Sequence, residues 1–363
     1  MITNRNTFLK IVLLCLIFLF LGEIGIRGMF FLSKRDVSAF DPGYFLYKPD
    51  PFTGYALVPG AAINHPTLKT KIDSLGYRSR EFAAKKPPGV YRIIVLGGSE
   101  AYGHGLNDGE TWSDQLQSLF DRSHPGKVEV INAAVDGFSS FQALISFSTR
   151  LLDFSPDLIL CYLGWNDIKY WPLVSPEKGF ESTGLAERKD QPALWKQWFH
   201  KSYLYIVGRA LRNKIPQEFV GLSKPATPSS PSNQKEDMDY GKYIFERNIR
   251  NIIGVAKVND VKVCLINQLN LISDGIQDEE KGKIYYILKE DELVKAVGGV
   301  KSILERVAHE EKAEYVDLNS LITPNLEMLL DHVHVTRKGA AAIAQQIHHY
   351  LIKSGLISSQ HAL

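Results

Sequence analysis

The chain has 363 residues, with 42 basic and 40 acidic side chains and a formal net charge of +2. Its 45% hydrophobic and 23% charged residues are typical of a folded globular protein and exclude a mainly disordered one. The near-neutral charge gives no indication of a nucleic-acid partner, and three cysteines are too few for a disulfide framework or a four-cysteine zinc site.

An apolar segment near the N-terminus predicts a membrane anchor. Uncharged residues rich in Leu, Ile and Phe occupy positions 11–22, and the apolar character continues to Leu32. The whole stretch is long enough for a bilayer, which a helix spans in about 20 residues. Glu23 and Arg27 interrupt it, but residues four apart can pair on a helix. We therefore assign residues 1–35 to a transmembrane anchor; a cleaved signal peptide and a buried helix are the alternatives.

Turn-forming residues dominate the next segment, residues 36–88. Pairs such as Pro59-Gly60 and Pro87-Pro88 interrupt it, and no long periodic pattern develops. We predict an extension of short strands and loops that lies over the main domain.

From residue 89 to residue 356, apolar runs typical of buried strands alternate with segments of helical periodicity. The predicted strands are 91–96, 127–132, 157–163, 261–267 and 313–318. The predicted helices are 111–120, 140–152, 243–258, 291–311 and 338–352. This alternation predicts one α/β domain, with a parallel sheet covered by helices on both faces. Residues 221–237, rich in Pro, Ser and Thr, are expected to form a mobile loop or insertion.

Four polar segments carry the candidate chemistry. Three directly follow predicted strands: Gly97-Gly98-Ser99-Glu100, residues 132–137, and Gly164-Trp165-Asn166-Asp167. The fourth, Asp331-His332-Val333-His334, precedes the last predicted helix. Ligands of open α/β sheets bind at the carboxyl ends of the strands, so we expect these segments to meet in one site.

The residue types in these segments suit acyl transfer by a serine nucleophile. Ser99 lies on a glycine-flanked turn and can attack, His334 can accept its proton, and Asp331 can hold the other imidazole nitrogen. The backbone N–H groups of Ser99 and Gly137, together with the Asn166 side-chain amide, can stabilise an oxyanion. The competing interpretation is that Ser99 only caps the helix that follows it.

Other residues of these segments have two interpretations each. Asp167 can orient the loop that carries Asn166 or contact substrate. Trp165, Tyr170 and Trp171 can bind substrate, for example by stacking on sugar rings, or can belong to the core.

A metal site is the alternative interpretation of the fourth segment. Asp331, His332 and His334 could act as ligands, but no further pair of His, Asp or Cys has the usual zinc spacing. We therefore expect neither a metal nor a cofactor, and we assign His332 to packing or to the surface.

Taken in this order, the four segments resemble the sequence blocks of the SGNH, or GDSL, hydrolase superfamily. The similar positions are Gly97-Gly98-Ser99-Glu100, Gly137, Gly164-x-Asn166-Asp167 and Asp331-x-x-His334, within residues 91–352. Gly98 and Glu100 depart from the eponymous motif, which has Asp and Leu at these positions. The resemblance implies a flavodoxin-like three-layer α/β/α fold and the hydrolysis of esters, often acetyl esters of glycans or lipids.

The anchor and the extension are similar to those of bacterial membrane-anchored members. The resemblance therefore implies a serine esterase of the cell envelope, with its catalytic domain in the periplasm or outside the cell. Its expected substrate is an acyl ester, such as an O-acetyl group of a polysaccharide. An O-acetyltransferase that uses the same residues on a surface glycan remains open, as does a catalytically silent protein that binds glycans or scaffolds an envelope complex.

Overall fold

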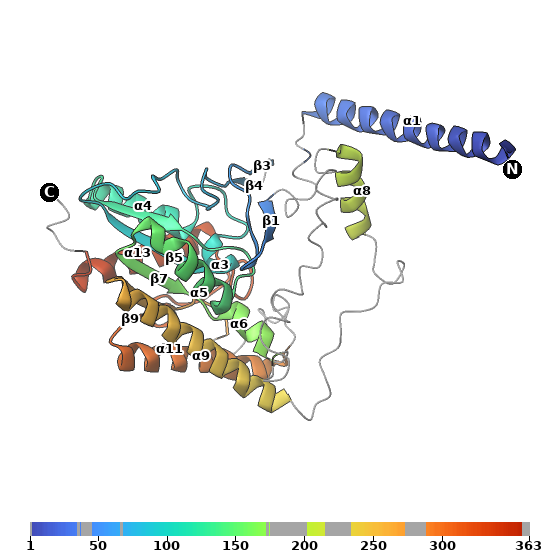
Figure 1. Cartoon of the computed structure of the whole chain (residues 1–363). Coiled ribbons are helices and arrows are strands. Elements are labelled where there is room, and N and C mark those ends of the chain that lie inside the picture. Colours follow the sequence, from blue (N-terminus) through green and yellow to red (C-terminus); the bar gives the residue numbers. More distant parts are fainter. Residues whose placement is uncertain are drawn as a thin grey trace.

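A computed structural model of the chain describes residues 2–34, 37, 46–65, 68–171, 174, 202–214, 234–272 and 288–357 (Figure 1). At its centre, five parallel strands form a sheet in the order β6-β5-β7-β8-β9. These strands are β5 (Tyr91–Gly97), β6 (Val128–Asn132), β7 (Leu158–Tyr162), β8 (Lys262–Asn267) and β9 (Glu314–Asp317).

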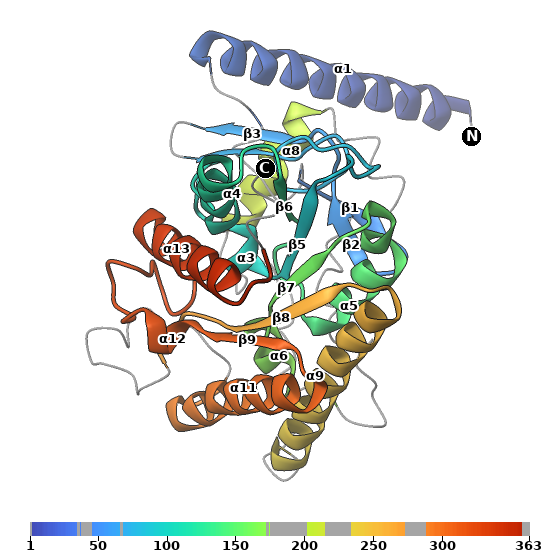
Figure 2. The ribbon, with the colours of Figure 1, turned by 90° about the vertical axis from the view of Figure 1, so that its left-hand side faces the viewer.

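Helices cover both faces of this sheet, as Figure 2 shows. On one face lie α4 (Trp112–Ser123) and α13 (Arg337–Lys353), and on the other α5 (Ser140–Thr149), α9 (Gln234–Val258) and α11 (Glu290–Glu311). Successive side chains of a strand point to opposite faces, so each strand contributes to two cores. In β5, Ile93 and Val95 pack on the first side, and Ile94 and Leu96 pack on the second. The predicted three-layer α/β/α fold is confirmed.

The strands and helices predicted for residues 89–356 are all found, but further helices among the described residues were not predicted. Four of these are short: α3 (Ser99–Tyr102), α6 (Trp165–Tyr170), α12 (Leu318–Leu321) and the 3-10 helix Leu151–Phe154. The other, α8 (Tyr203–Lys214), has 12 residues. Helix α9 begins at Gln234, so it takes in the end of the segment expected to be a loop. Residues 221–233 of that segment lie outside the described residues.

Two antiparallel hairpins lie N-terminal to the sheet. They pair β1 (Tyr47–Asp50) with β2 (Gly54–Leu57), and β3 (Ala62–His65) with β4 (Leu68–Lys71). Tyr55, Leu57 and Ile63 are buried in the same core as α4 and α13. The hairpins therefore pack on the body of the molecule instead of extending from it as a free arm.

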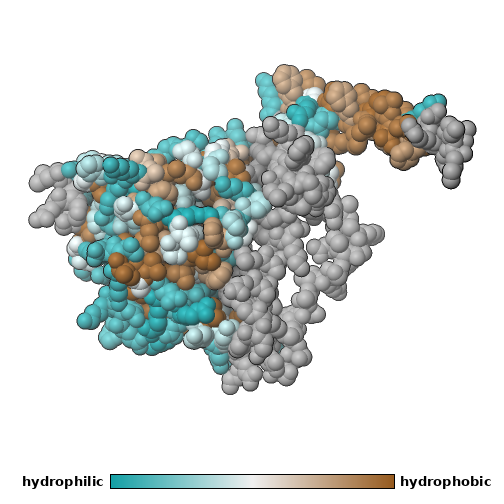
Figure 3. Space-filling model, in the orientation of Figure 1, coloured by the Kyte–Doolittle hydropathy of each residue, from teal (hydrophilic) through white to brown (hydrophobic). Residues whose placement is uncertain are grey.

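The N-terminal helix α1 (Ile2–Ser33) projects from this body and presents a long apolar surface (Figures 1 and 3). Its segment Thr7–Ser33 is long and apolar enough to cross a membrane. The expected ion pair forms, with Arg27 Nε 2.7 Å from Glu23 Oε1. Glu23 also accepts hydrogen bonds from the backbone N–H groups of Tyr203 and Leu204 at the start of α8. By length and composition, α1 fits a membrane anchor or a signal sequence.

Candidate active site

Ser99 is the first residue of α3, directly after the carboxyl end of β5. The two glycines before it are required by close contacts. A Cβ atom on Gly97 would lie 2.4 Å from Ala101 Cβ, and one on Gly98 would lie 2.1 Å from Asn166 Nδ2. Because real Cβ atoms do not approach other atoms so closely, only glycine lets β5 turn into α3 at this point.

Ser99, His334 and Asp331 form a continuous hydrogen-bonded chain. Ser99 Oγ lies 2.8 Å from His334 Nε2, and His334 Nδ1 lies 2.7 Å from Asp331 Oδ2. The other carboxylate oxygen of Asp331 accepts the backbone N–H groups of Val333 at 3.0 Å and His334 at 2.8 Å. Asp331 thus fixes both the imidazole ring and the loop that carries it.

These hydrogen bonds also set the charge of Asp331. Partial burial alone would raise the pKa of this carboxyl, but the His334 ring and the two backbone N–H groups stabilise the carboxylate more strongly. The pKa of Asp331 is therefore held well below its usual range. An ionised Asp331 accepts Nδ1–H of His334, which leaves Nε2 to receive a proton from Ser99.

Asn166 lies beside the Ser99 turn, on α6 after the carboxyl end of β7. Its side-chain Nδ2 donates to the backbone oxygen of Phe138 at 2.9 Å, which fixes the orientation of the amide. An asparagine amide has two N–H donors, so one is left for a second acceptor. Gly137, at φ +80°, forms the turn just before Phe138. Asn166 and the Gly137 turn are therefore brought together next to Ser99.

Asp167 and Trp171, both considered as substrate contacts, are buried, as is Trp165. Asp167 is 1% exposed, and its carboxylate accepts the backbone N–H and the hydroxyl of Ser140. Burial raises the pKa of Asp167 to about 7, against the opposing effect of these hydrogen bonds. Trp171 is 1% exposed and packs against Phe245 in the core. Both side chains support the site loop from within and do not face a ligand.

Trp165 and His332 form a packed pair behind His334. Their ring centroids are 4.6 Å apart, and the two side chains are 6% and 7% exposed. His332 therefore has a packing position, as expected. The side chain of Tyr170, the remaining candidate contact, lies outside the described residues.

Glu100, next to Ser99, is a buried carboxyl group. It is 2% exposed, and neither of its carboxylate oxygens has a hydrogen-bond partner in the described part of the chain. Burial raises its pKa to about 7. A Cβ atom on Gly98 would lie 2.6 Å from Glu100 Oε2. The Glu100 carboxyl therefore lies close to the point from which a side chain on residue 98 would start.

A second pair of histidine and carboxylate was missed from the sequence. His104 Nδ1 lies 3.0 Å from Asp136 Oδ2, and the His104 ring is 5.1 Å from the ring of His334. The sequence indicates this pair only by the positions of its members: His104 follows the Ser99 segment, and Asp136 directly precedes Gly137.

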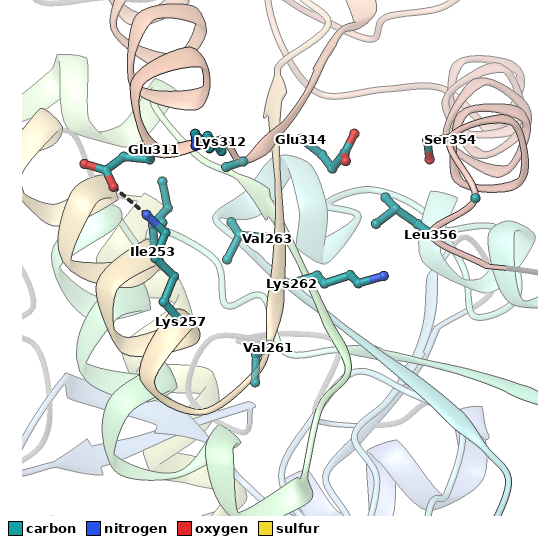
Figure 4. Close-up of a pocket in the computed structure, with 12 residues that line it drawn as sticks. Ile253, Lys257, Val261, Lys262, Val263, Glu311, Lys312, Glu314, Ser354 and Leu356 are labelled. Atoms are coloured by element: carbon teal, nitrogen blue, oxygen red, sulfur yellow. Dashed lines mark hydrogen bonds and ion pairs between the residues drawn. The ribbon is translucent and has the colours of Figure 1, made fainter.

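A cavity of about 370 Å³ opens at the amino ends of the strands, at the other end of the sheet from Ser99 (Figure 4). It is lined by residues that begin β8 and β9, such as Val263 and Glu314, and by the Lys257–Glu311 ion pair at 2.7 Å. Its place at the amino ends of the strands separates it from Ser99. Within the described residues, no cluster of three or more His, Cys, Asp or Glu side chains is arranged to hold a metal ion.

Comparisons with known proteins identify the family of the chain. The model of the GDSL-like Lipase/Acylhydrolase family matches residues 95–342, and no curated protein sequence matches the chain. A solved GDSL-like lipase from Bacteroides thetaiotaomicron is 16% identical with a TM-score of 0.42, and the match covers 75% of this chain and 93% of that one.

Two further solved structures are similar to this chain. A psychrotrophic esterase from a Pseudoalteromonas species is 14% identical with a TM-score of 0.43, over 74% of this chain and 99% of that one. An acetylxylan esterase from Geobacillus stearothermophilus is 13% identical with a TM-score of 0.42, over 71% and 93%.

Proposed function

Because the chain belongs to the GDSL-like lipase/acylhydrolase family, and so is an ester hydrolase, we propose that Ser99, His334 and Asp331 are its catalytic triad. The observation that carries the proposal is the unbroken chain of hydrogen bonds from Ser99 Oγ through the imidazole to Asp331. A serine hydroxyl is a weak nucleophile alone, and a base within hydrogen-bond distance activates it.

In the first step, His334 Nε2 takes the proton of Ser99 as Oγ attacks the acyl carbonyl. The carbonyl oxygen becomes an oxyanion, which accepts hydrogen bonds from the N–H groups of Ser99 and Gly137 and from Asn166 Nδ2. The ionised Asp331 stabilises the imidazolium that forms. His334 then gives its proton to the leaving alcohol oxygen, and the bond between that oxygen and the acyl carbon breaks.

In the second step, water attacks the acyl group on Ser99. His334 takes a proton from this water and returns it to Ser99 Oγ as the carboxylic acid leaves, so the enzyme ends in its starting state. The same cycle with a sugar hydroxyl in place of water transfers the acyl group to that sugar.

The proposed substrate is an O-acetyl group of a cell-envelope polysaccharide or a related small ester. Helix α1 supports this assignment, since an apolar helix of this length would keep the catalytic domain at a membrane. With the domain on the outer side of that membrane, in the periplasm or beyond it, the site would face envelope polymers.

The direct test is labelling of the full-length protein in detergent by a serine-directed fluorophosphonate. We expect labelling of the wild type and its loss in Ser99→Ala, together with a drop of at least about 10³-fold in ester turnover. Ser148→Ala is the matched control, because Ser148 is exposed on α5 and donates only to backbone oxygens of its own helix.

Unlabelled but folded wild-type protein would contradict the triad and favour a silent glycan-binding role. Where labelling succeeds, adding an unacetylated saccharide separates the two reactions of the acyl-enzyme. A hydrolase releases acetate at the same rate, whereas an O-acetyltransferase forms an acetylated saccharide.

A further inference from the structure

His104 and Asp136 form a second histidine–carboxylate pair at the mouth of the site. The distance from His104 Nδ1 to Asp136 Oδ2 is 3.0 Å, and the two side chains are 59% and 19% exposed. His104 thus offers most of its ring to solvent, while the carboxylate that holds it is largely covered. Neither residue has a part in the triad or in the oxyanion site described above.

The backbone holds this imidazole in a fixed place relative to the nucleophile. The N–H groups of Gly103 and His104 both donate to the backbone oxygen of Ser99 at 3.0 Å. Gly103 and Gly105, at φ +88° and +79°, make the turn that carries His104 between them. The buried guanidinium of Arg78 donates to the backbone oxygen of Gly103 at 2.6 Å. His104 is therefore positioned on a turn with defined hydrogen bonds.

The position of the His104 ring beside His334 indicates which part of a substrate His104 contacts. The two ring centroids are 5.1 Å apart, at an interplanar angle of 44°. His334 Nε2 must deliver its proton to the leaving alcohol oxygen, so the alcohol lies next to this ring. The oxyanion donors at Gly137 and Asn166 surround the acyl carbonyl instead. A group this close to the His334 ring can reach the alcohol side of the scissile bond.

The charges around His104 favour a hydrogen-bond donor at this position. The hydrogen bond with Asp136 raises the pKa of His104 most, burial lowers it, and the charges of Asp136 and Asp331 raise it further against a smaller opposing effect of Arg78. The net effect is a raised pKa. With Nδ1–H directed to Asp136, a protonated ring presents Nε2–H to whatever enters the site.

We propose that His104, held by Asp136, donates a hydrogen bond to an oxygen on the alcohol part of the ester and so selects hydroxyl-rich alcohols such as saccharides. The inference rests on the proposed esterase function and specifies the substrate class of that same site. A site built to bond a hydroxyl discriminates against analogues that lack it.

The test compares two acetyl esters on full-length protein in detergent: a mono-O-acetylated methyl glycoside and p-nitrophenyl acetate, whose alcohol has no neighbouring hydroxyl. We expect His104→Phe, which keeps a ring but no donor, to lower kcat/KM for the glycoside about tenfold more than for p-nitrophenyl acetate. His104→Gln, whose amide lies close to the position of Nε2, should restore most of the preference.

The inference would be overturned if His104→Phe lowered kcat/KM equally for both esters, or if His104→Gln did not restore the preference for the glycoside. So would a wild type that hydrolyses p-nitrophenyl acetate but not the glycoside. Failure of the proposed function is distinguishable, because the wild type would then be inert to both esters and to fluorophosphonate. Fluorophosphonate labelling and thermal unfolding of each variant show whether Ser99 and the fold remain intact.

Discussion

The amide of Asn166 is held by Phe138 through one of its two N–H groups, and the other faces the reacting centre in our proposal. We expect Asn166→Ala to lower kcat by about 10²–10³-fold with little change in KM, since the lost bond forms with the oxyanion only in the transition state. Steady-state kinetics on p-nitrophenyl acetate measure this. A loss confined to KM would assign Asn166 to substrate binding instead.

The buried carboxyl of Glu100 is expected to make the free energy of unfolding depend on pH. Its pKa rises from 4.5 to about 7 on folding because burial disfavours the charged form. The folded state therefore binds the proton of the Glu100 carboxyl more tightly than the unfolded state does. The contribution of this proton to the stability of the folded state is complete below pH 4.5 and is lost as the pH rises through 7.

Glu100→Gln removes the charge and keeps the size of the side chain. We expect it to raise the free energy of unfolding at pH 8, relative to wild type, by about 1–3 kcal/mol, with much less effect at pH 4.5. Urea unfolding at the two pH values measures the difference. Asp167, with a pKa also raised to about 7, is present in both proteins, and its charge is one of the effects that raise the pKa of Glu100. Equal effects of the substitution at both pH values would contradict the prediction.

Among the elements, α3 depends on a side chain from outside it. The buried guanidinium of Arg78 donates to the backbone oxygens of Tyr102, Gly103 and Leu106, at and just after the end of this four-residue helix. Arg78→Ala would remove this donor from all three oxygens, of which Gly103 O keeps the N–H of Leu106, so we expect it to lower the free energy of unfolding by about 2–4 kcal/mol.

The neighbouring Arg80→Ala is the matched control for Arg78→Ala. Arg80 pairs with Asp121 at 2.7 Å, but both side chains are largely exposed, and such pairs contribute only about 0–1 kcal/mol. Denaturant unfolding of both variants measures the contrast. Similar losses in the two would mean that Arg78 does not support helix α3 as described.

The long elements could be predicted because each has a local pattern, such as the continuous apolar run of β5 or the periodicity of α11. Helices α3 and α12 have four residues each, too few for any period to show. The strand order depends on pairing between distant segments, which no local pattern encodes. The four polar segments could be placed together because parallel strands align their carboxyl ends, whereas the His104–Asp136 contact depends on the exact path of two turns.

At the scale of the whole molecule, the role of α1 is open to a direct test. If it anchors the chain, the full-length protein stays in membranes after alkaline carbonate extraction and keeps its N-terminal residues. Leu13→Arg with Leu16→Arg should weaken this retention, because a charge near the centre of a span costs about 2.5–3.5 kcal/mol on insertion scales. Thr7→Arg, at the first residue of the apolar segment, is the control. A processed N-terminus, read by mass spectrometry, would identify a signal sequence instead.

The cysteines allow the side of the membrane to be determined. Cys161 and Cys264 are buried, and Cys15 lies within the apolar helix. Ser148→Cys on the exposed side of α5 therefore adds one thiol accessible from water. We expect a membrane-impermeant maleimide to label it in intact spheroplasts, with the wild type as the blank. Labelling only after lysis would place the catalytic domain in the cytoplasm.

The hydrogen bond between Ser99 and His334 joins residues that are 235 positions apart. During synthesis, Ser99 therefore emerges long before His334, and the two meet only once the C-terminal segment has docked α13 against α4. An unfinished chain lacks this hydrogen bond. The order of the chain thus ties assembly of the proposed triad to completed folding of the last helix.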